Sequence, residues 1–217
     1  MLGIETVRAA VVTAASGLGI RPDKEAPFLE RDLRDGLVTA LGGNREHKIL
    51  IQGWSRTLGG VDVFVPGAVI PELEPERSTG IETKVWATDE VLYDLLKLAA
   101  MCQQADLGVG YAVVAARHRD WAADAARGGV ISEMSTGMPD AATWPTDEAI
   151  GYEGAHWRKM VEKTNVKPAW VPARIATITT DAVAVRAVQD HEIRIIGVRP
   201  IGNDRLRLDE HGSVVDA

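Results

Sequence analysis

The sequence contains a single cysteine, Cys102, among its 217 residues. One cysteine excludes an intramolecular disulfide and fits the reducing cytoplasm, where we expect the protein to reside. The sequence also lacks an apolar run of the ~18 residues that a membrane-spanning helix requires. Residues 9–20 are moderately apolar, but Glu5 precedes them and no cluster of positive charge or cleavage site frames them. We therefore expect neither a secretory signal nor a membrane partner.

Positive charge is also in short supply. The 24 lysines and arginines are outnumbered by 31 aspartates and glutamates, so the formal net charge is −7. Proteins that depend on broad, nonspecific contact with phosphates are usually basic, because neutralising phosphates drives that affinity. The acidity therefore argues against strong stand-alone DNA binding. It does not exclude a nuclease, whose metal-binding carboxylates add negative charge.

Two helices are predicted before the first strand. The apolar residues Ile4, Val7, Val11 and Leu18 fall on one stripe, which predicts a packed amphipathic helix at the start of the chain. A polar link over residues 21–27 leads to a second helix over residues 28–41. Leucines recur every four residues along that helix, and two consecutive glycines end it.

Three strand-like runs follow the second helix. They cover residues 48–54 (KILIQGW), 60–66 (GVDVFVP) and 80–86 (GIETKVW). The connection over residues 67–79 is rich in Pro and Glu and is too long for a tight hairpin turn. A helix capped by Thr88 and ending near Gln104 comes next, and residues 109–116 (VGYAVVAA) suit a buried strand.

The second half of the chain is predicted to be less regular. A short helix is expected over residues 120–127, a loop-rich stretch over 128–145 and a helix over 148–165 that its glycines weaken. Beyond it, the β-branched segments predict strands over residues 173–188, 192–198 and 205–208. We divide the chain into residues 1–127, a helix plus an α/β core, and residues 128–217, a β-rich C-terminal appendage. The appendage is expected to pack on the core as part of one structural unit.

Charged and apolar residues alternate along the second and third strands. Side chains on a strand point to opposite faces in turn, so Val61, Val63 and Val65 are expected on one face. If these strands pair antiparallel with the valines in the core, then Asp62, Glu82 and Lys84 converge on the other face. Two adjacent carboxylates raise each other's pKa unless a cation neutralises them, and Mg²⁺ favours such oxygen ligands.

A simpler explanation exists for the same pattern. Alternating charged and apolar residues are typical of any half-exposed antiparallel strand, and an isolated Glu-x-Lys is more often a solvated face. Under this explanation, residues 48–86 form an exposed sheet in an unrelated α/β protein. The order of elements favours the site: an acidic helix, three strands carrying Asp and then Glu-x-Lys, a helix and a buried strand.

In that order, residues 28–116 resemble the PD-(D/E)xK nuclease superfamily, also called the restriction-endonuclease-like fold. The resemblance implies an αβββαβ core, with Asp62 as the first metal ligand, Glu82 as the second acidic position and Lys84 as the motif lysine. Glu30 matches a position where many members carry a further acidic ligand. The family's proline is replaced by Val61. The segment from Glu82 through the following helix also resembles actinobacterial proteins that carry this motif.

The resemblance implies a metal-dependent nuclease that hydrolyses phosphodiester bonds of DNA, with RNA as the less favoured substrate and Mg²⁺ or Mn²⁺ as cofactor. Asp62, Glu82 and Glu30 would hold the metal, and Lys84 would position a water or stabilise the transition state. Many members cut as dimers, so a homodimer or another protein partner stays open.

Two further questions stay open at this point. Tyr93 and Lys97 form a pair at helical spacing on the helix before the buried strand. The resemblance implies that this helix projects a polar residue into the site, which makes Lys97, with Tyr93, a supporting residue; a solvated stripe is the alternative. The second hypothesis for the whole chain is a catalytically inactive nuclease fold that serves as a binding or assembly module in a defence, repair or regulatory complex. The acidic net charge favours this second hypothesis.

Overall fold

The computed structural model describes residues 2–19, 28–49, 51, 54, 59–67, 77–85, 90–104, 107–126, 130–135, 142–164, 167–185 and 190–215. The helices are α1 (Ile4–Ser16), α2 (Glu30–Leu41), α3 (Val91–Gln103), α4 (His118–Ala126), α5 (Val130–Ser135), α6 (Thr146–Glu153) and α7 (Ala155–Lys163). The strands are β1 (Asn44–Ile49), β2 (Gly59–Val65), β3 (Ser78–Val85), β4 (Leu107–Arg117), β5 (Ala142–Pro145), β6 (Trp170–Pro172), β7 (Arg174–Thr179), β8 (Val183–Ala184), β9 (His191–Pro200), β10 (Arg205–Leu208) and β11 (Val214–Val215).

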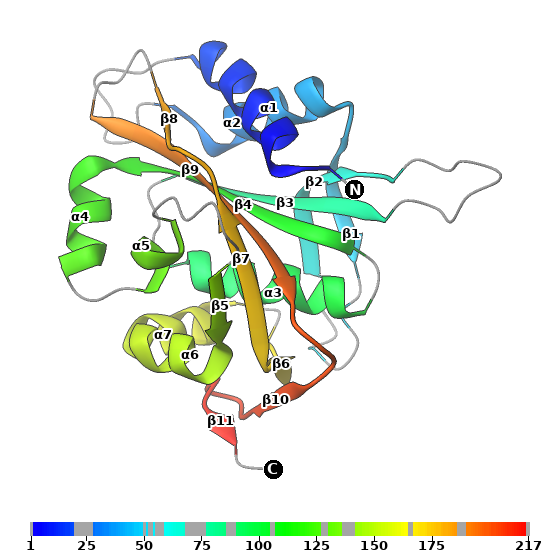
Figure 1. Ribbon diagram of the computed structural model, residues 1–217, viewed down its shortest axis with the longest axis vertical. Helices are drawn as coiled ribbons and strands as arrows, with labels where there is room; N and C mark the ends of the chain where they lie inside the picture. Colours follow the sequence, from blue (N-terminus) through cyan, green and yellow to red (C-terminus); the bar gives the residue numbers. More distant parts are fainter. Residues whose placement is uncertain are drawn as a thin grey trace.

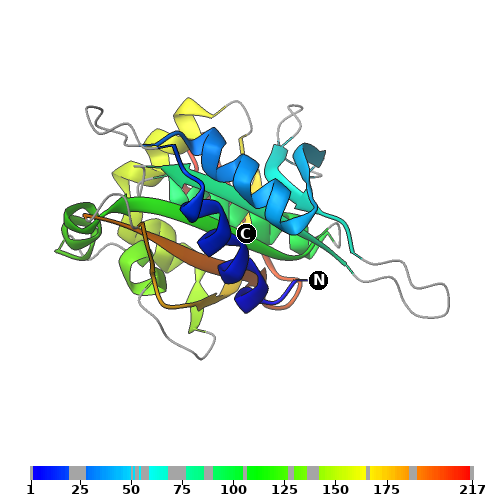
Figure 2. The same ribbon diagram turned by 90° about the horizontal axis from the view of Figure 1, so that it is seen from above.

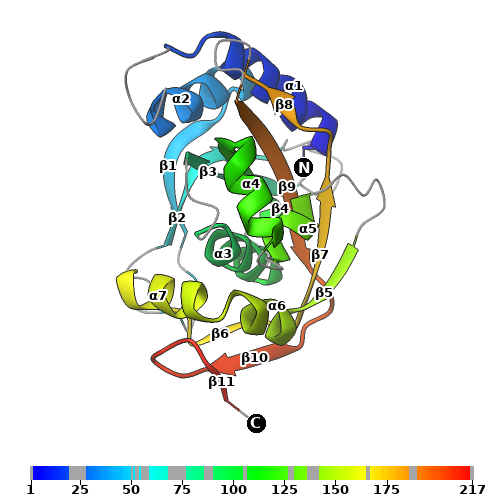
Figure 3. The same cartoon turned by 90° about the vertical axis from the view of Figure 1, so that its left-hand side faces the viewer.

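A mixed sheet of eight strands separates two layers of helices (Figures 1 and 3). Its strand order is β1-β2-β3-β4-β9-β7-β5, and β8 also pairs with β9. Helices α1 and α2 cover one face, and the apolar side chains between them and the sheet form the α1-side core. Helix α3 and helices α4 to α7 cover the opposite face and enclose the α3-side core. Every helix in the described residues is too short or too polar to cross a lipid bilayer.

The two predicted N-terminal helices are confirmed. Helix α1 buries Val7, Val11 and two alanines on the stripe read from the sequence, and α2 ends at Gly42 in the left-handed conformation that favours glycine. The two helices lie side by side (Figure 2). A Cβ at Gly36 of α2 would lie only 2.7 Å from the Cβ of Ala14 on α1, so glycine permits this close packing.

The middle of the chain contains the predicted strands, with one shifted boundary. Strands β2 and β3 agree with the expected runs to within two residues at each end. Strand β1 begins at Asn44 rather than at residue 48, because it is an edge strand whose first five residues are exposed and carry no apolar pattern. Strands β1, β2 and β3 pair antiparallel, and β4 returns parallel to β3 after α3. Helix α3 runs from Val91 to Gln103, and the expected cap at Thr88 lies outside the described residues.

The C-terminal half is a continuation of the main sheet, so the expected appendage is wrong for most of its strands. Strand β9 pairs antiparallel with β4 from Gly110 to Arg117, and β7 and β5 extend the sheet further. Strand β4 is buried, so the backbone groups along both of its edges need hydrogen-bonding partners. Periodicity within one segment does not reveal which strand supplies the second partner. Only β6, β10 and β11, among the strands described, form a separate small sheet.

Two shorter segments also differ from expectation. The stretch 128–145, expected to be irregular, contains α5 and β5, and β5 pairs with β7 at the edge of the sheet. The helix expected over residues 148–165 is two helices, α6 and α7, which meet at Gly154 with a φ of +43°. Glycine adopts that positive φ without the steric cost that a side chain would add.

Candidate functional site

Strand β2 becomes irregular at Asp62. Its antiparallel ladder with β3 ends at the pair Val63–Ile81, just before Asp62 is reached. On the other side, Glu46 of β1 lies between two residues that pair with Val61 and Val63, and it has a positive φ of +47°. Val61 packs in the α3-side core but Val63 packs in the α1-side core. The predicted common face of these valines is therefore wrong, because the irregular backbone interrupts the alternation.

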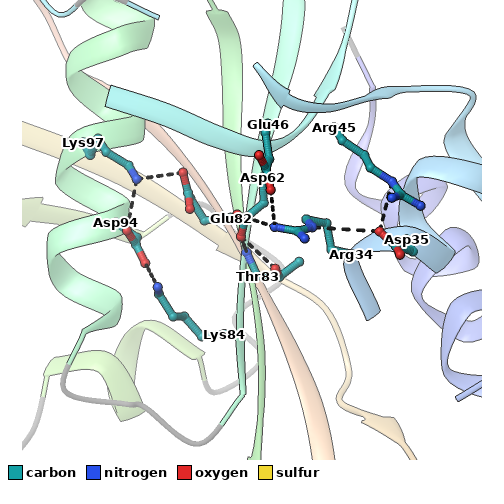
Figure 4. A network of polar contacts seen from close by, with 10 residues as sticks. All are labelled: Arg34, Asp35, Arg45, Glu46, Asp62, Glu82, Thr83, Lys84, Asp94 and Lys97. Carbon is teal, nitrogen blue, oxygen red and sulfur yellow. Dashed lines mark hydrogen bonds and ion pairs between the residues drawn. The ribbon is translucent and has the colours of Figure 1, made fainter. Parts of the chain in front are cut away.

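The carboxylate of Asp62 on β2 points toward Arg34 of α2 and Thr83 of β3 (Figure 4). Its Oδ2 accepts hydrogen bonds from the backbone N–H of Thr83 at 2.8 Å and from the Thr83 hydroxyl at 2.7 Å. Its Oδ1 lies 3.8 Å from Nη1 of Arg34 on α2, which also contacts Glu46 Oε1 at 3.1 Å. Asp62 thus replaces the missing backbone pairing between β2 and β3 with a side-chain contact.

Glu82 and Lys84 share one face of β3, as the alternation predicted, and both reach α3 (Figure 4). Lys97 Nζ lies 2.8 Å from Glu82 Oε1 and 3.3 Å from Asp94 Oδ1. Lys84 Nζ lies 3.4 Å from Asp94 Oδ2 and 3.5 Å from Glu90 Oε2. Asp94 therefore bridges the two lysines, and the chain of contacts runs from Glu82 to Lys84.

Burial makes the protonation of this network unusual. The side chains of Glu82 and Asp94 are 5% exposed and that of Lys97 is 10% exposed. Burial raises the pKa of Glu82 to about 8, with the charges of Asp94 and Asp62 adding to the rise and Lys97 opposing it. Burial alone would lower the pKa of Lys97, but Glu82 and Asp94 raise it above its ordinary value. Lys97 therefore keeps its proton, and Glu82 is the group that titrates near neutral pH.

Glu30 lies at the first residue of α2 and is coupled to the same group of charges. Burial raises the pKa of Glu30, Lys84 opposes that rise and Asp62 adds to it. The backbone N–H of Val85 also donates a hydrogen bond to the Glu30 carboxylate. The structure thus brings Glu30 within electrostatic range of Asp62 and Lys84, from the opposite side of β3 to α3.

The two residues expected to support the site on α3 differ in their positions. Lys97 is buried against Glu82, which excludes the solvated stripe that was its alternative. Tyr93 lies beside Lys97, whose Nζ is 5.9 Å from the ring centroid. However, the Tyr93 hydroxyl is 3.2 Å from the Thr164 hydroxyl, and its ring packs near Trp157. Tyr93 is therefore part of the wall beside the network, with its hydroxyl bonded to the end of α7.

Sequence reasoning missed three residues that hold this arrangement together. Arg34 lies four residues, about one helical turn, after Glu30 on α2. This spacing is the signal that could have identified Arg34 as a residue on the same helical face. Thr83 lies between two motif residues, and its role follows only from the irregular pairing at Asp62. Asp94 lies three residues before Lys97 on α3, and its burial gave no sequence signal because a carboxylate is seldom buried.

The donor atoms fit a hard divalent cation in kind, and Lys97 already occupies one of them. Among the described residues, no three acidic, histidine or cysteine side chains lie close enough together to hold a metal ion. Mg²⁺ is commonly bound through only one or two carboxylates, with waters and substrate phosphates as its other ligands. The pKa of Glu82 is raised mainly by burial; Lys97 opposes that rise, and the charges of Asp94 and Asp62 add to it. Asp62 and Glu82 are the two residues that would hold such an ion, but Asp62 contacts Thr83 and Arg34 whereas Glu82 contacts Lys97.

Comparisons with known proteins give no assignment. No protein-family model matches the chain, and neither does any curated protein or solved structure.

Proposed function

We propose that the protein is a metal-dependent nuclease that hydrolyses phosphodiester bonds of DNA, with RNA as the less favoured substrate. One observation carries the proposal: Glu82 and Lys84 share a face of β3, and the charges of Asp62 on β2 and Glu30 on α2 act on that pair. The order α2, β1, β2, β3, α3, β4, with β4 parallel to β3, supports a PD-(D/E)xK-like core.

Each charged residue has a distinct part in the proposal. Asp62 and Glu82 would hold Mg²⁺ or Mn²⁺, and Glu30 would act as an outer ligand, because no three acidic side chains among the described residues lie close enough to share one ion. The bound cation would act as a Lewis acid toward the phosphate and its attacking water. Lys84 orients that water or stabilises negative charge on the phosphate, because Asp94 and Glu90 hold its ammonium in place.

Lys97 is the resident counter-ion of Glu82 in this proposal. Its ammonium is 2.8 Å from Glu82 Oε1, and Asp94 holds it from the other side. A divalent cation at Glu82 would have to share the carboxylate with Lys97, which would weaken metal binding. The same contact lowers the cost of burying Glu82 when no metal is present.

The second candidate function is a binding or assembly module that does not cut nucleic acid. The observation that favours it is that both motif carboxylates already have partners from within the chain, Lys97 for Glu82 and Thr83 for Asp62. The net charge of −7 favours contact with a protein over contact with bare phosphates.

Cleavage assays with matched variants separate the two functions. Supercoiled plasmid, single-stranded DNA and RNA are incubated with the protein in Mg²⁺, in Mn²⁺ and in a chelator. We expect metal-dependent cutting that Glu82→Gln and Lys84→Ala abolish, while Lys159→Ala, an exposed lysine on α7, leaves it unchanged. Cutting that survives both site variants would exclude this site. If the protein does not bind Mn²⁺ at millimolar concentration, and Glu82→Gln does not change that result, the non-catalytic module is favoured.

A further inference from the structure

A pocket of about 300 Å³ lies on the α1 side of the sheet, near the start of the chain marked N in Figure 1. Its floor is formed by strands β4, β9 and β7, and residues 2–4 form one wall. Glu82 and Lys84 reach α3 on the opposite face of the sheet, so the pocket is separate from the proposed nuclease site. The size falls at the lower end of the range, about 300 to 1,000 Å³, in which small molecules bind.

The floor of the pocket depends on small residues. Gly197 of β9 lies between Tyr111 of β4 and Ile178 of β7, with which it pairs directly. A Cβ at Gly197 would come within 2.9 Å of the Tyr111 ring and 2.8 Å of the Ile178 side chain, so a larger residue would push the floor apart. Ala176, two residues before Ile178, leaves the space beside it open.

The polar groups of the wall are already bonded to the protein. The Tyr111 hydroxyl donates a hydrogen bond of 2.9 Å to the carbonyl of Leu2. The Leu2 N–H donates to the Thr79 hydroxyl at 3.1 Å. These bonds hold the wall in place. The apolar residues Leu2 and Ile4 of the wall line the pocket, and such a lining suits an apolar ligand.

Arg199 supplies the one charge among the described residues that line the pocket. It pairs across the strands with Ala176, so it stands at the rim directly beside the open space. No acidic residue lines the pocket, and Arg199 has no ion-pair partner among the residues that the structure describes. A guanidinium beside an apolar hollow complements a ligand with an apolar body and a carboxylate head.

We propose that this pocket binds a small apolar monocarboxylate, with its chain over Gly197 and its carboxylate on Arg199. Guanidinium groups bind carboxylates with two parallel hydrogen bonds, and burial of the chain supplies the remaining affinity. The site is independent of the proposed nuclease activity, because its floor and wall share no residue with the charged network.

Isothermal titration with octanoate, hexanoate, 1-octanol and octylammonium tests the proposal on the full chain. Octanoate is expected to bind at one site, and hexanoate about tenfold more weakly because two methylene groups are lost. Octylammonium is expected not to bind. Equal binding of octanoate and octylammonium, or no saturable binding of octanoate, would overturn the proposal.

Two variants locate the binding. Arg199→Gln is expected to weaken octanoate binding about tenfold and to leave 1-octanol binding unchanged, because only the charged contact is removed. Arg207→Gln on β10 makes the same change of charge away from the pocket and should have no effect. Ala176→Leu fills the pocket and should weaken the binding of both octanoate and 1-octanol. Octanoate binding that neither Arg199→Gln nor Ala176→Leu alters would place the ligand elsewhere and refute the proposal.

Discussion

Lys97 Nζ lies 2.8 Å from Glu82 Oε1, and both side chains are almost completely enclosed between α3 and β3. Asp94 holds the same lysine from the other side, so one ammonium compensates two buried carboxylates. Lys97 is therefore important for stability as well as for the proposed metal site.

Lys97→Met should destabilise the protein because it leaves Glu82 and Asp94 buried without their shared cation. We expect a loss of about 3 kcal/mol in the free energy of unfolding, measured by urea denaturation above the Glu82 pKa of about 8. The double variant Glu82→Gln/Lys97→Met should recover part of that loss. Lys159→Met on the exposed face of α7 serves as the control. A single variant as stable as the unmodified protein would contradict the buried ion pair.

The pH dependence of stability should show the titration of Glu82. Its pKa is about 8 in the folded protein against 4.5 without burial, so the folded state holds the proton more tightly than the unfolded state. The contribution of Glu82 to stability is therefore complete below pH 4.5 and decreases as the pH rises to about 8. The difference in Tm between the unmodified protein and Glu82→Gln, measured from pH 5 to pH 8.5, should change in that direction. A difference that stays constant across this range would show that Glu82 titrates normally.

Asp62→Asn separates metal binding from folding. The asparagine side-chain oxygen still accepts the Thr83 N–H bond, so the variant should fold with a far-ultraviolet circular dichroism spectrum like that of the unmodified protein. The loss of one anionic ligand should weaken Mn²⁺ binding at least about tenfold, as followed by electron paramagnetic resonance. Asp181→Asn, at an exposed carboxylate after β7, is the matched control. Equal Mn²⁺ affinity in all three proteins would remove Asp62 from the proposed ligand set.

The contact between α1 and α2 can be tested at Gly36. Gly36→Ala places a methyl group 2.7 Å from the Cβ of Ala14, so one helix must move. We expect a loss of about 1 to 3 kcal/mol in thermal or urea unfolding. Gly151→Ala makes the same change in α6, where no atom lies within 4 Å, and should stabilise the protein slightly. A neutral Gly36→Ala would show that the two helices pack less closely than described.

The sequence predicted local features of the fold better than long-range ones. The apolar stripes of α1 and α2 and the shared face of Glu82 and Lys84 follow from the 3.6-residue and two-residue periods of helix and strand. The position of β9 beside β4 does not follow from such a period, because pairing between segments far apart in the chain produces no periodic pattern in either segment. The first strand was misplaced because its exposed residues lack an apolar pattern.

The candidate site was predicted in part for a related physical reason. Regular alternation would place Asp62 with Glu82, but the irregular backbone near Glu46 and Asp62 turns the first carboxylate toward Thr83. The burial of Asp94 was unexpected, since isolated carboxylates are rarely enclosed. Its two lysine partners become visible only once α3 is packed against β3.

The pairing of β9 with β4 affects how the chain can fold as it is synthesised. The last residue of β4 is Arg117, whereas its antiparallel neighbour begins only at His191. Until that later segment leaves the ribosome, one edge of an apolar strand has no hydrogen-bonding partner, and such edges recruit other chains. The N-terminal half is therefore a poor independent folding unit. A truncated chain that ends near residue 127 should associate or be degraded, whereas the full chain closes the sheet.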